Sequence, residues 1–291
     1  MLNMFSRSFV VDKAVFIPSI VFLLSTVGIV LLFPDASDAA FGAMQAAIVE
    51  HASWYYGLVM AILLITSGVL AFSRVGSIRL GPDNSSPDYS LFSWLSMLFA
   101  AGVGIGLMFY GVAEPVVHYL RPPIGDGTAI GAENQAVNLT MLHWGFNAWS
   151  VYALMALVLA YFSFRRGLPL TLRSAFFPIV GDRIYGPFGA AIDVFAIVCT
   201  TFGISTSLGL GVEQLSTGLY YLFNVPESGG MKLAITIAIM SMAAVSVALG
   251  LDTGIKRLSE INSFLAIALL CFVLLMGPTA LILGGTLENF G

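Results

Sequence analysis

Long apolar runs separated by short polar segments dominate the hydrophobic pattern of the chain. A helix needs about twenty such residues to cross a bilayer core of about 30 Å. Runs near this length occupy residues 13–33, 52–73, 91–113, 138–163, 187–210, 232–250 and 261–284. The pattern therefore predicts an all-α membrane protein with seven transmembrane helices. The amphipathic stretch at residues 213–230 is predicted to lie along the outer interface.

The composition excludes a water-soluble globule, because 58% of the residues are hydrophobic and only 10% are charged. Cys199 and Cys271 both lie in apolar runs, so neither a disulfide framework nor a CxxC metal motif is available. The first apolar run is longer than the core of a signal peptide and lacks an A-x-A exit. We therefore expect it to remain as a helix.

The positions of lysine and arginine predict the orientation of the chain. With the N-terminus in the cytoplasm, the outer segments carry only Arg121 and Lys232. The inner segments then carry ten basic residues: Arg7, Lys13, Arg74, Arg79, Arg165, Arg166, Arg173, Arg183, Lys256 and Arg257. Because cytoplasmic loops are enriched in basic residues, the N-terminus is predicted to be cytoplasmic, in a multi-pass protein of the cytoplasmic membrane.

Four glycines, at positions 102, 104, 106 and 111, weaken the third apolar run as a helix. A dinucleotide-binding loop would need a preceding strand, which the pattern does not predict. Gly102 and Gly106 form a GxxxG pair that could pack against another helix. Alternate glycines do not share one helical face, however, because residues two apart lie about 200° apart. The spacing also fits a locally unwound helix whose carbonyls face a cation or ligand.

Aromatic residues gather in the fourth run, within the stretch HWGFNAWSVY. In one continuous helix, Trp144 and Tyr152 would lie about 12 Å apart along the axis and about 80° apart around it, so both could line one cavity. One interpretation is an aromatic belt at the outer interface, including Trp149. The other is half of an aromatic cage for a quaternary ammonium ion, which ring faces attract.

Hydroxyl side chains interrupt the fifth run, in the stretch CTTFGISTSLGLG. Thr201 and Ser205 are spaced i and i+4 and so share one helical face, where two hydroxyls could coordinate a hard cation such as Na⁺. Alternatively, such hydroxyls bond to carbonyls of the preceding turn. Asp193, further back in this run, is either a functional acid or the partner of a nearby arginine.

No catalytic residue is expected from the sequence. His143 has no acid or thiol beside it, so we expect a hydrogen-bonding role. The apolar runs contain no nucleophile with a base, no HExxH motif and no pair of acids that would support an enzyme.

Five motifs in order resemble the betaine/carnitine/choline transporters: GVGIGLMFYGVAEP, HWGFNAWSVYAL, YFSFRRGLPLTLRSAFFPIVGDRIYGP, FGISTSLGLGVEQLSTGL and GLDTGIKRLSEIN. The resemblance begins near residue 10 and continues to the last residue. It implies a core of ten helices in two inverted five-helix repeats, preceded by two extra helices. Residues 1–90 would hold the extra helices and residues 91–291 the first repeat. The implied function is secondary active transport of glycine betaine, choline or carnitine, coupled to sodium or protons.

The resemblance also assigns roles to individual residues. It places Trp144 and Tyr152 in the substrate cage, with Trp149 nearby on the transport path. The resemblance also implies substrate contacts from three residues of the bent glycine-rich helix: Val103, Gly104 and Gly106. Val103 stands where a methionine is common in the family. Thr201 and Ser205 would belong to one sodium site, and the backbones of Ala100 and Val103 to another.

The resemblance further implies which partners the protein has. We expect a small quaternary-ammonium substrate, a lipid bilayer and a homotrimer, with Na⁺ as coupling ion, no other cofactor and no nucleic acid. Because the second repeat is absent, we expect a fragment, a truncated product or one of two chains, which does not transport by itself. The alternative is a non-transporting membrane subunit that acts in packing or sensing.

Overall fold

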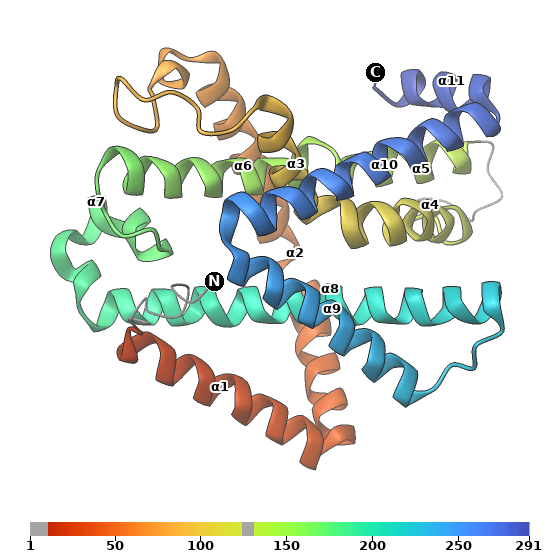
Figure 1. The fold of residues 1–291 in the computed structure, drawn as a ribbon, viewed down its shortest axis with the longest axis horizontal. Helices are drawn as coiled ribbons and strands as arrows, with labels where there is room; N and C mark the ends of the chain where they lie inside the picture. Colours follow the sequence, from red (N-terminus) through yellow and green to blue (C-terminus); the bar gives the residue numbers. More distant parts are fainter. Residues whose placement is uncertain (1–10, 124–130, 291) are drawn as a thin grey trace. The chain divides into compact units, whose positions relative to one another are not determined.

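The computed structural model describes residues 11–123 and 131–290, and in these ranges the chain consists of helices and short connections without a strand. Arg7 of the predicted inner set lies outside the described residues. The helices can be followed along the chain by colour in Figure 1. They divide into two compact units, one made of residues 11–85 and 147–203, the other of residues 86–146 and 204–290.

The first unit contains the N-terminal helices and the segment that follows the aromatic stretch. Its elements are α1 (Lys13–Leu32), α2 (Pro34–Phe72), η1 (Arg74–Ser77), α6 (Phe146–Ala160), η3 (Tyr161–Arg165), η4 (Leu172–Phe176), α7 (Phe177–Val180), η5 (Gly181–Tyr185) and the first half of α8 (Pro187–Phe223). The side chain of Asp12 caps α1 by accepting the N–H of Ala14 at 3.0 Å. Pro34 then separates α1 from α2, since the residue before a proline disfavours helical geometry.

The second unit contains the glycine-rich segment. Its elements are α3 (Leu91–Gly102), η2 (Val103–Tyr110), α4 (Gly111–Leu120), α5 (Ala132–Trp144), α9 (Gly229–Gly250), η6 (Leu251–Ile255), α10 (Lys256–Met276), α11 (Thr279–Phe290) and the second half of α8. Helix α3 packs against α10, and α4 packs against α5. The Ser93 hydroxyl of α3 donates to Glu260 of α10 at 2.6 Å, which fixes the register of that pair.

Five helical segments among the described residues are long and apolar enough to cross a membrane: Lys13–Leu32, Pro34–Phe72, Ala132–Arg165, Pro187–Phe223 and Gly229–Met276. Large apolar side chains on them stay exposed, including Leu31 at 75% and Ile65 at 64%, as expected of surfaces that meet lipid. The chain is therefore a multi-pass membrane protein. The count of seven spans and the division at residue 90 stay predictions.

The sixth predicted span (232–250) and the larger part of the seventh (261–284) lie within the segment Gly229–Met276, and the seventh ends in α11. Gly250 separates α9 from η6 and α10, because its φ of +81° is a left-handed conformation that glycine adopts without strain. The third predicted span is divided into α3, η2 and α4, and Leu91–Ala100 is a shorter apolar helix among the residues that the structure describes.

The fourth predicted span is not one continuous helix. At Gly145 the backbone turns to φ −83° and ψ −142°, and α5 ends before α6 begins. A Cβ at this position would lie 2.4 Å from the carbonyl oxygen of Met141, so the break requires a glycine. The geometry that one unbroken helix would give Trp144 and Tyr152 is therefore wrong.

The fifth predicted span is longer than expected. Helix α8 has 37 residues and continues to Phe223, where Asn224 ends it with a positive φ of 53°. Such a helix is about 55 Å long and exceeds the bilayer core. Residues 213–223 of the predicted interfacial stretch thus continue this helix, instead of starting a separate element.

Candidate functional site

The glycine-rich segment changes its hydrogen-bonding pattern where the sequence predicts an interruption. Helix α3 ends at Gly102, and η2 is a π-helix over Val103–Tyr110, in which the N–H of Gly111 donates to the carbonyl of Gly106. The π-helix thus interrupts α-helical bonding inside the glycine-rich segment. The predicted unwinding is wrong, because the segment stays helical with a wider turn. Such π segments are frequent at functional sites.

The indole ring of Trp144 lies against this π-helix. A Cβ added to Gly106 would come within 2.6 Å of the ring carbon Cζ3 of Trp144. The Trp144 ring also stacks on the Tyr110 ring, with centroids 5.6 Å apart and planes inclined by 28°. Gly106 thus permits a close approach, as its place in a GxxxG pair indicates, but the group that approaches is an aromatic ring instead of a second backbone.

Glu114 lies at the centre of a polar cluster on α4 and α5. One carboxylate oxygen, Oε1, contacts His118 Nε2 at 3.2 Å and also contacts His143 Nδ1. The other oxygen, Oε2, accepts the indole N–H of Trp144. The carboxylate thereby joins both histidines to the tryptophan, and the Glu114 side chain is only 13% exposed.

The cluster was missed at the level of sequence. The hydrogen-bonding role expected for His143 is confirmed, but its partner is an acid that the sequence does not place beside it. Glu114 lies 29 residues earlier in the chain and meets His143 across two packed helices. The available signal was the GVAEP stretch, which places a carboxylate at the end of the glycine-rich segment.

The remaining aromatic residues of the predicted cage lie on α6. The rings of Trp149 and Tyr152 have centroids 5.7 Å apart, and Tyr152 is 57% exposed. These two residues belong to the first unit and Trp144 to the second. A cage built from all three rings therefore stays a prediction.

The predicted sodium-site residues are placed as follows. The Thr201 hydroxyl donates to the carbonyl of Ile197 at 2.8 Å, which is the bond to the preceding turn that the alternative interpretation predicts. Its oxygen lone pairs remain able to accept or coordinate. Ser205 is exposed one turn later on α8, and Ala100 lies near the end of α3. The backbone of Val103 opens η2, while its side chain lies outside the described part of the chain. Both sodium sites stay predictions.

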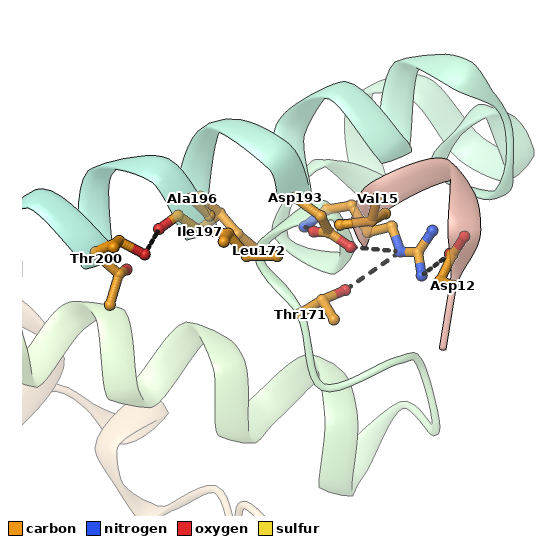
Figure 2. A pocket seen from close by; sticks show the side chains of 10 residues that line it. Asp12, Val15, Thr171, Leu172, Asp193, Ala196, Ile197 and Thr200 are labelled. Atoms are coloured by element: carbon orange, nitrogen blue, oxygen red, sulfur yellow. Dashed lines mark hydrogen bonds and ion pairs between the residues drawn. The ribbon is translucent and has the colours of Figure 1, made fainter. Parts of the chain in front are cut away.

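Asp193 lines a cavity of about 400 Å³ in the first unit, together with residues at the starts of α1 and η4 and on the first half of α8 (Figure 2). The side chain of Asp193 accepts the backbone N–H of Arg173 at 3.2 Å and pairs with the Arg173 Nε at 3.0 Å. The interpretation of Asp193 as the partner of an arginine is confirmed. Thr201 lines the same cavity.

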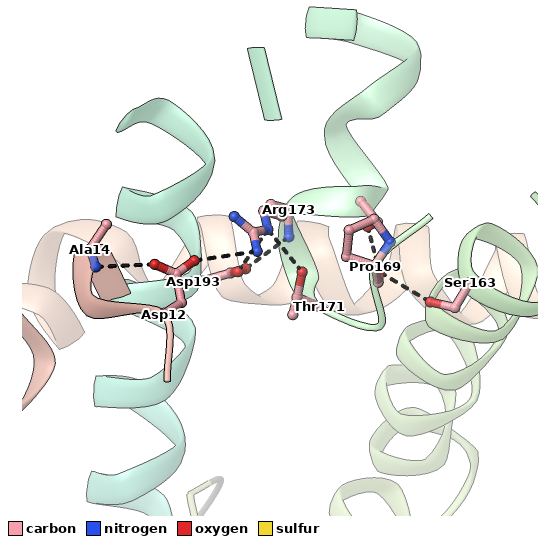
Figure 3. A network of polar contacts seen from close by, with 8 residues as sticks. Asp12, Ala14, Ser163, Pro169, Thr171, Arg173 and Asp193 are labelled. Atoms are coloured by element: carbon pink, nitrogen blue, oxygen red, sulfur yellow. Dashed lines mark hydrogen bonds and ion pairs between the residues drawn. The ribbon is translucent and has the colours of Figure 1, made fainter. Parts of the chain in front are cut away.

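Arg173 connects three segments of the first unit (Figure 3). Besides its pair with Asp193, its Nη2 lies 3.8 Å from Asp12 and its Nε 3.3 Å from the Thr171 hydroxyl. Asp193 is 5% exposed, and a buried charge needs such a partner because desolvation is costly. Since Asp12 also caps α1, the network joins the first helix to α8.

These features define a class: a multi-pass helical membrane protein in which a glycine-rich helix is interrupted and meets aromatic and acidic side chains. The model of the betaine/carnitine/choline family of transporters matches residues 14–291. The chain belongs to that family. Its members are transporters, in line with the expectation that the chain is not an enzyme.

Individual relatives agree with this assignment. A glycine betaine transporter of Acinetobacter baylyi is 46% identical over 98% of this chain and 43% of its own length. A high-affinity choline transport protein of Escherichia coli K12 is 46% identical over 90% of this chain and 39% of its own length. A glycine betaine/proline/choline transporter of Vibrio parahaemolyticus is 41% identical over 92% of this chain and 53% of its own length. The chain thus spans about half or less of the length of these relatives.

Proposed function

We propose that the chain forms part of a secondary transporter that carries glycine betaine, choline or carnitine across the cytoplasmic membrane. The observation that carries this proposal is the position of Trp144, whose ring lies on the π-helix at Gly106 and whose N–H is held by Glu114. The names of the relatives support a quaternary-ammonium substrate.

The chemistry of the substrate fits this arrangement. A trimethylammonium group carries positive charge but no N–H donor, so aromatic faces bind it better than hydrogen-bond acceptors do. Trp144 and its neighbour Tyr110 offer such faces beside the interrupted helix, and the Glu114 carboxylate adds a favourable charge. The proposed substrate contacts are those of the family resemblance: Trp144, Tyr152, Trp149, Val103, Gly104 and Gly106.

The coupling ion and the topology belong to the same proposal. Sodium would bind at Thr201 and Ser205 and at the backbones of Ala100 and Val103, because hydroxyl and carbonyl oxygens suit hard cations. The basic residues support a cytoplasmic N-terminus, with seven spans that comprise two extra helices and one five-helix repeat. A homotrimer completes the proposed assembly.

Uptake by cells that lack their own carriers tests the proposal. The complete gene product that contains this chain is expressed, and labelled betaine, choline and carnitine are supplied with sodium or with potassium in its place. Saturable uptake of at least one of the three is expected. No uptake by protein that reaches the membrane would contradict the proposal and favour a non-transporting subunit.

A further inference from the structure

Two of the three histidines of the chain lie beside the same carboxylate. His118 follows Glu114 by one helical turn on α4, and His143 approaches from α5. The ligand atoms of the three side chains lie within 4.8 Å of one another. The third histidine, His51, lies on α2 in the first unit, where its Nδ1 contacts the carbonyl of Ala47 at 3.0 Å.

We propose that Glu114, His118 and His143 form a binding site for a divalent transition-metal ion, with Zn²⁺ as the best fit. Two imidazoles and one carboxylate are a ligand set that zinc accepts, with water in the fourth position. Zinc–nitrogen bonds of about 2.0–2.1 Å place the ligand atoms of a tetrahedral site about 3.3 Å apart. Atoms already within 4.8 Å reach that spacing by small side-chain rotations.

The surroundings of the cluster favour a metal site over a chance meeting of polar groups. The i, i+4 spacing on α4 presents Glu114 and His118 on one face, and the packing of α4 against α5 adds His143. Glu114 and His118 are partly buried, whereas His143 is exposed, so the cluster is open on one side. The Trp144 N–H orients the carboxylate through its second oxygen, as outer-shell donors commonly orient metal-binding carboxylates.

Occupation of this site would reach beyond the three ligands. An ion bound to Oε1 would fix the Glu114 carboxylate, and Oε2 of the same group holds the indole of Trp144. A metal would thus restrain the ring that lies on Gly106. Binding itself does not depend on the proposed transport activity.

Calorimetric titration of the purified chain with Zn²⁺ tests the proposal. The chain is used in detergent micelles without a histidine tag, and we expect one saturable site. His118→Gln and His143→Gln should each weaken binding at least tenfold, because glutamine replaces a ligand by a poor one. His51→Gln is the matched control and should bind as the unsubstituted chain does.

A second measurement needs no variant and so stands if the substitutions prevent folding. Cu²⁺ bound to the unsubstituted chain should give an electron paramagnetic resonance spectrum with splitting from two imidazole nitrogens. A spectrum of aqueous Cu²⁺ only, or an unsubstituted chain that takes up no Zn²⁺, would overturn the proposal. So would His118→Gln and His143→Gln variants that bind Zn²⁺ undiminished, or a His51→Gln variant that loses binding equally.

Discussion

The ring of Trp144 and the backbone of Gly106 lie so close that a methyl group at position 106 would come within 2.6 Å of the ring carbon Cζ3. This approach joins the interrupted helix η2 to α5. Position 106 is a glycine because the Trp144 ring leaves no room there for a larger side chain. The sequence alone indicates only that a glycine weakens the helix.

Gly106→Ala should therefore impair the proposed substrate site. Overpacking of this kind costs about 1–3 kcal/mol, so displacement of Trp144 should raise the half-saturation concentration for choline or betaine about tenfold or more. Gly111→Ala is the matched control, because a Cβ there meets nothing within 4 Å. Uptake assays on the complete gene product at equal membrane levels measure both. If Gly106→Ala and Gly111→Ala raise the half-saturation concentration equally, the contact between position 106 and Trp144 is not the cause.

The buried ion pair of the first unit predicts a large effect on stability. Asp193→Asn should destabilise the chain by about 3–5 kcal/mol, because it leaves Arg173 without its buried charged partner. Thermal unfolding in detergent measures the difference.

Asp12→Asn provides the control for that experiment. The Asp12 carboxylate is 51% exposed and lies 3.8 Å from Arg173, and asparagine still caps a helix, so little loss of stability is expected. If both variants unfold at the same temperature, the pair with Asp193 does not anchor the network.

Asp83 and Arg165 predict a pH dependence outside the membrane-spanning segments. The Arg165 Nη1 donates to the Asp83 carboxylate at 2.5 Å, and this hydrogen bond, with the arginine charge, lowers the pKa of Asp83 below its ordinary value of 3.8. A lowered folded-state pKa stabilises the fold above the ordinary pKa, and the contribution is lost as the pH falls through the lowered value.

Asp83→Asn should therefore unfold at a slightly lower temperature than the unsubstituted chain at pH 7. The difference should shrink as the pH falls below about 4, because the Asp83 carboxyl is then protonated and neutral, as the amide is at every pH. The effect is small because the carboxylate is exposed. A difference that persists undiminished at pH 3 would exclude the charge on Asp83 as its source.

The sequence predicted those parts of the fold that depend on local pattern. Apolar runs mark where helices lie, and the alternate glycines of η2 mark where α-helical bonding stops. The spacing of the glycines indicates only that the helix is weakened, however. It does not distinguish a π-helix from an unwound segment. The break at Gly145 was likewise hidden, because it depends on a backbone conformation inside an apolar run.

The site was less predictable because its contacts join distant segments. Trp144 was a candidate for its ring, yet its hydrogen bond to Glu114 joins residues 30 positions apart. Asp193 was different, because an acid inside an apolar run requires a partner, and arginines lie near the same end of the helix. The sequence did not indicate which arginine it is.

If Trp144 forms one face of a quaternary-ammonium site, Trp144→Leu should weaken the binding of the substrate. The substitution keeps an apolar side chain but removes the aromatic face and the N–H donated to Glu114. A desolvated cation over a ring gains about 2 kcal/mol, so the half-saturation concentration should rise about thirtyfold. Trp144→Phe keeps a ring without the donor and should have a smaller effect.

The measurement is uptake of labelled choline and betaine by the complete gene product, with Trp54→Leu as control because Trp54 is a 70% exposed tryptophan on α2. The half-saturation concentration should rise about thirtyfold for Trp144→Leu and change by less than about twofold for Trp54→Leu, at equal amounts of protein in the membrane. A half-saturation concentration for Trp144→Leu within twofold of the unsubstituted transporter would contradict the place of Trp144 in the quaternary-ammonium site.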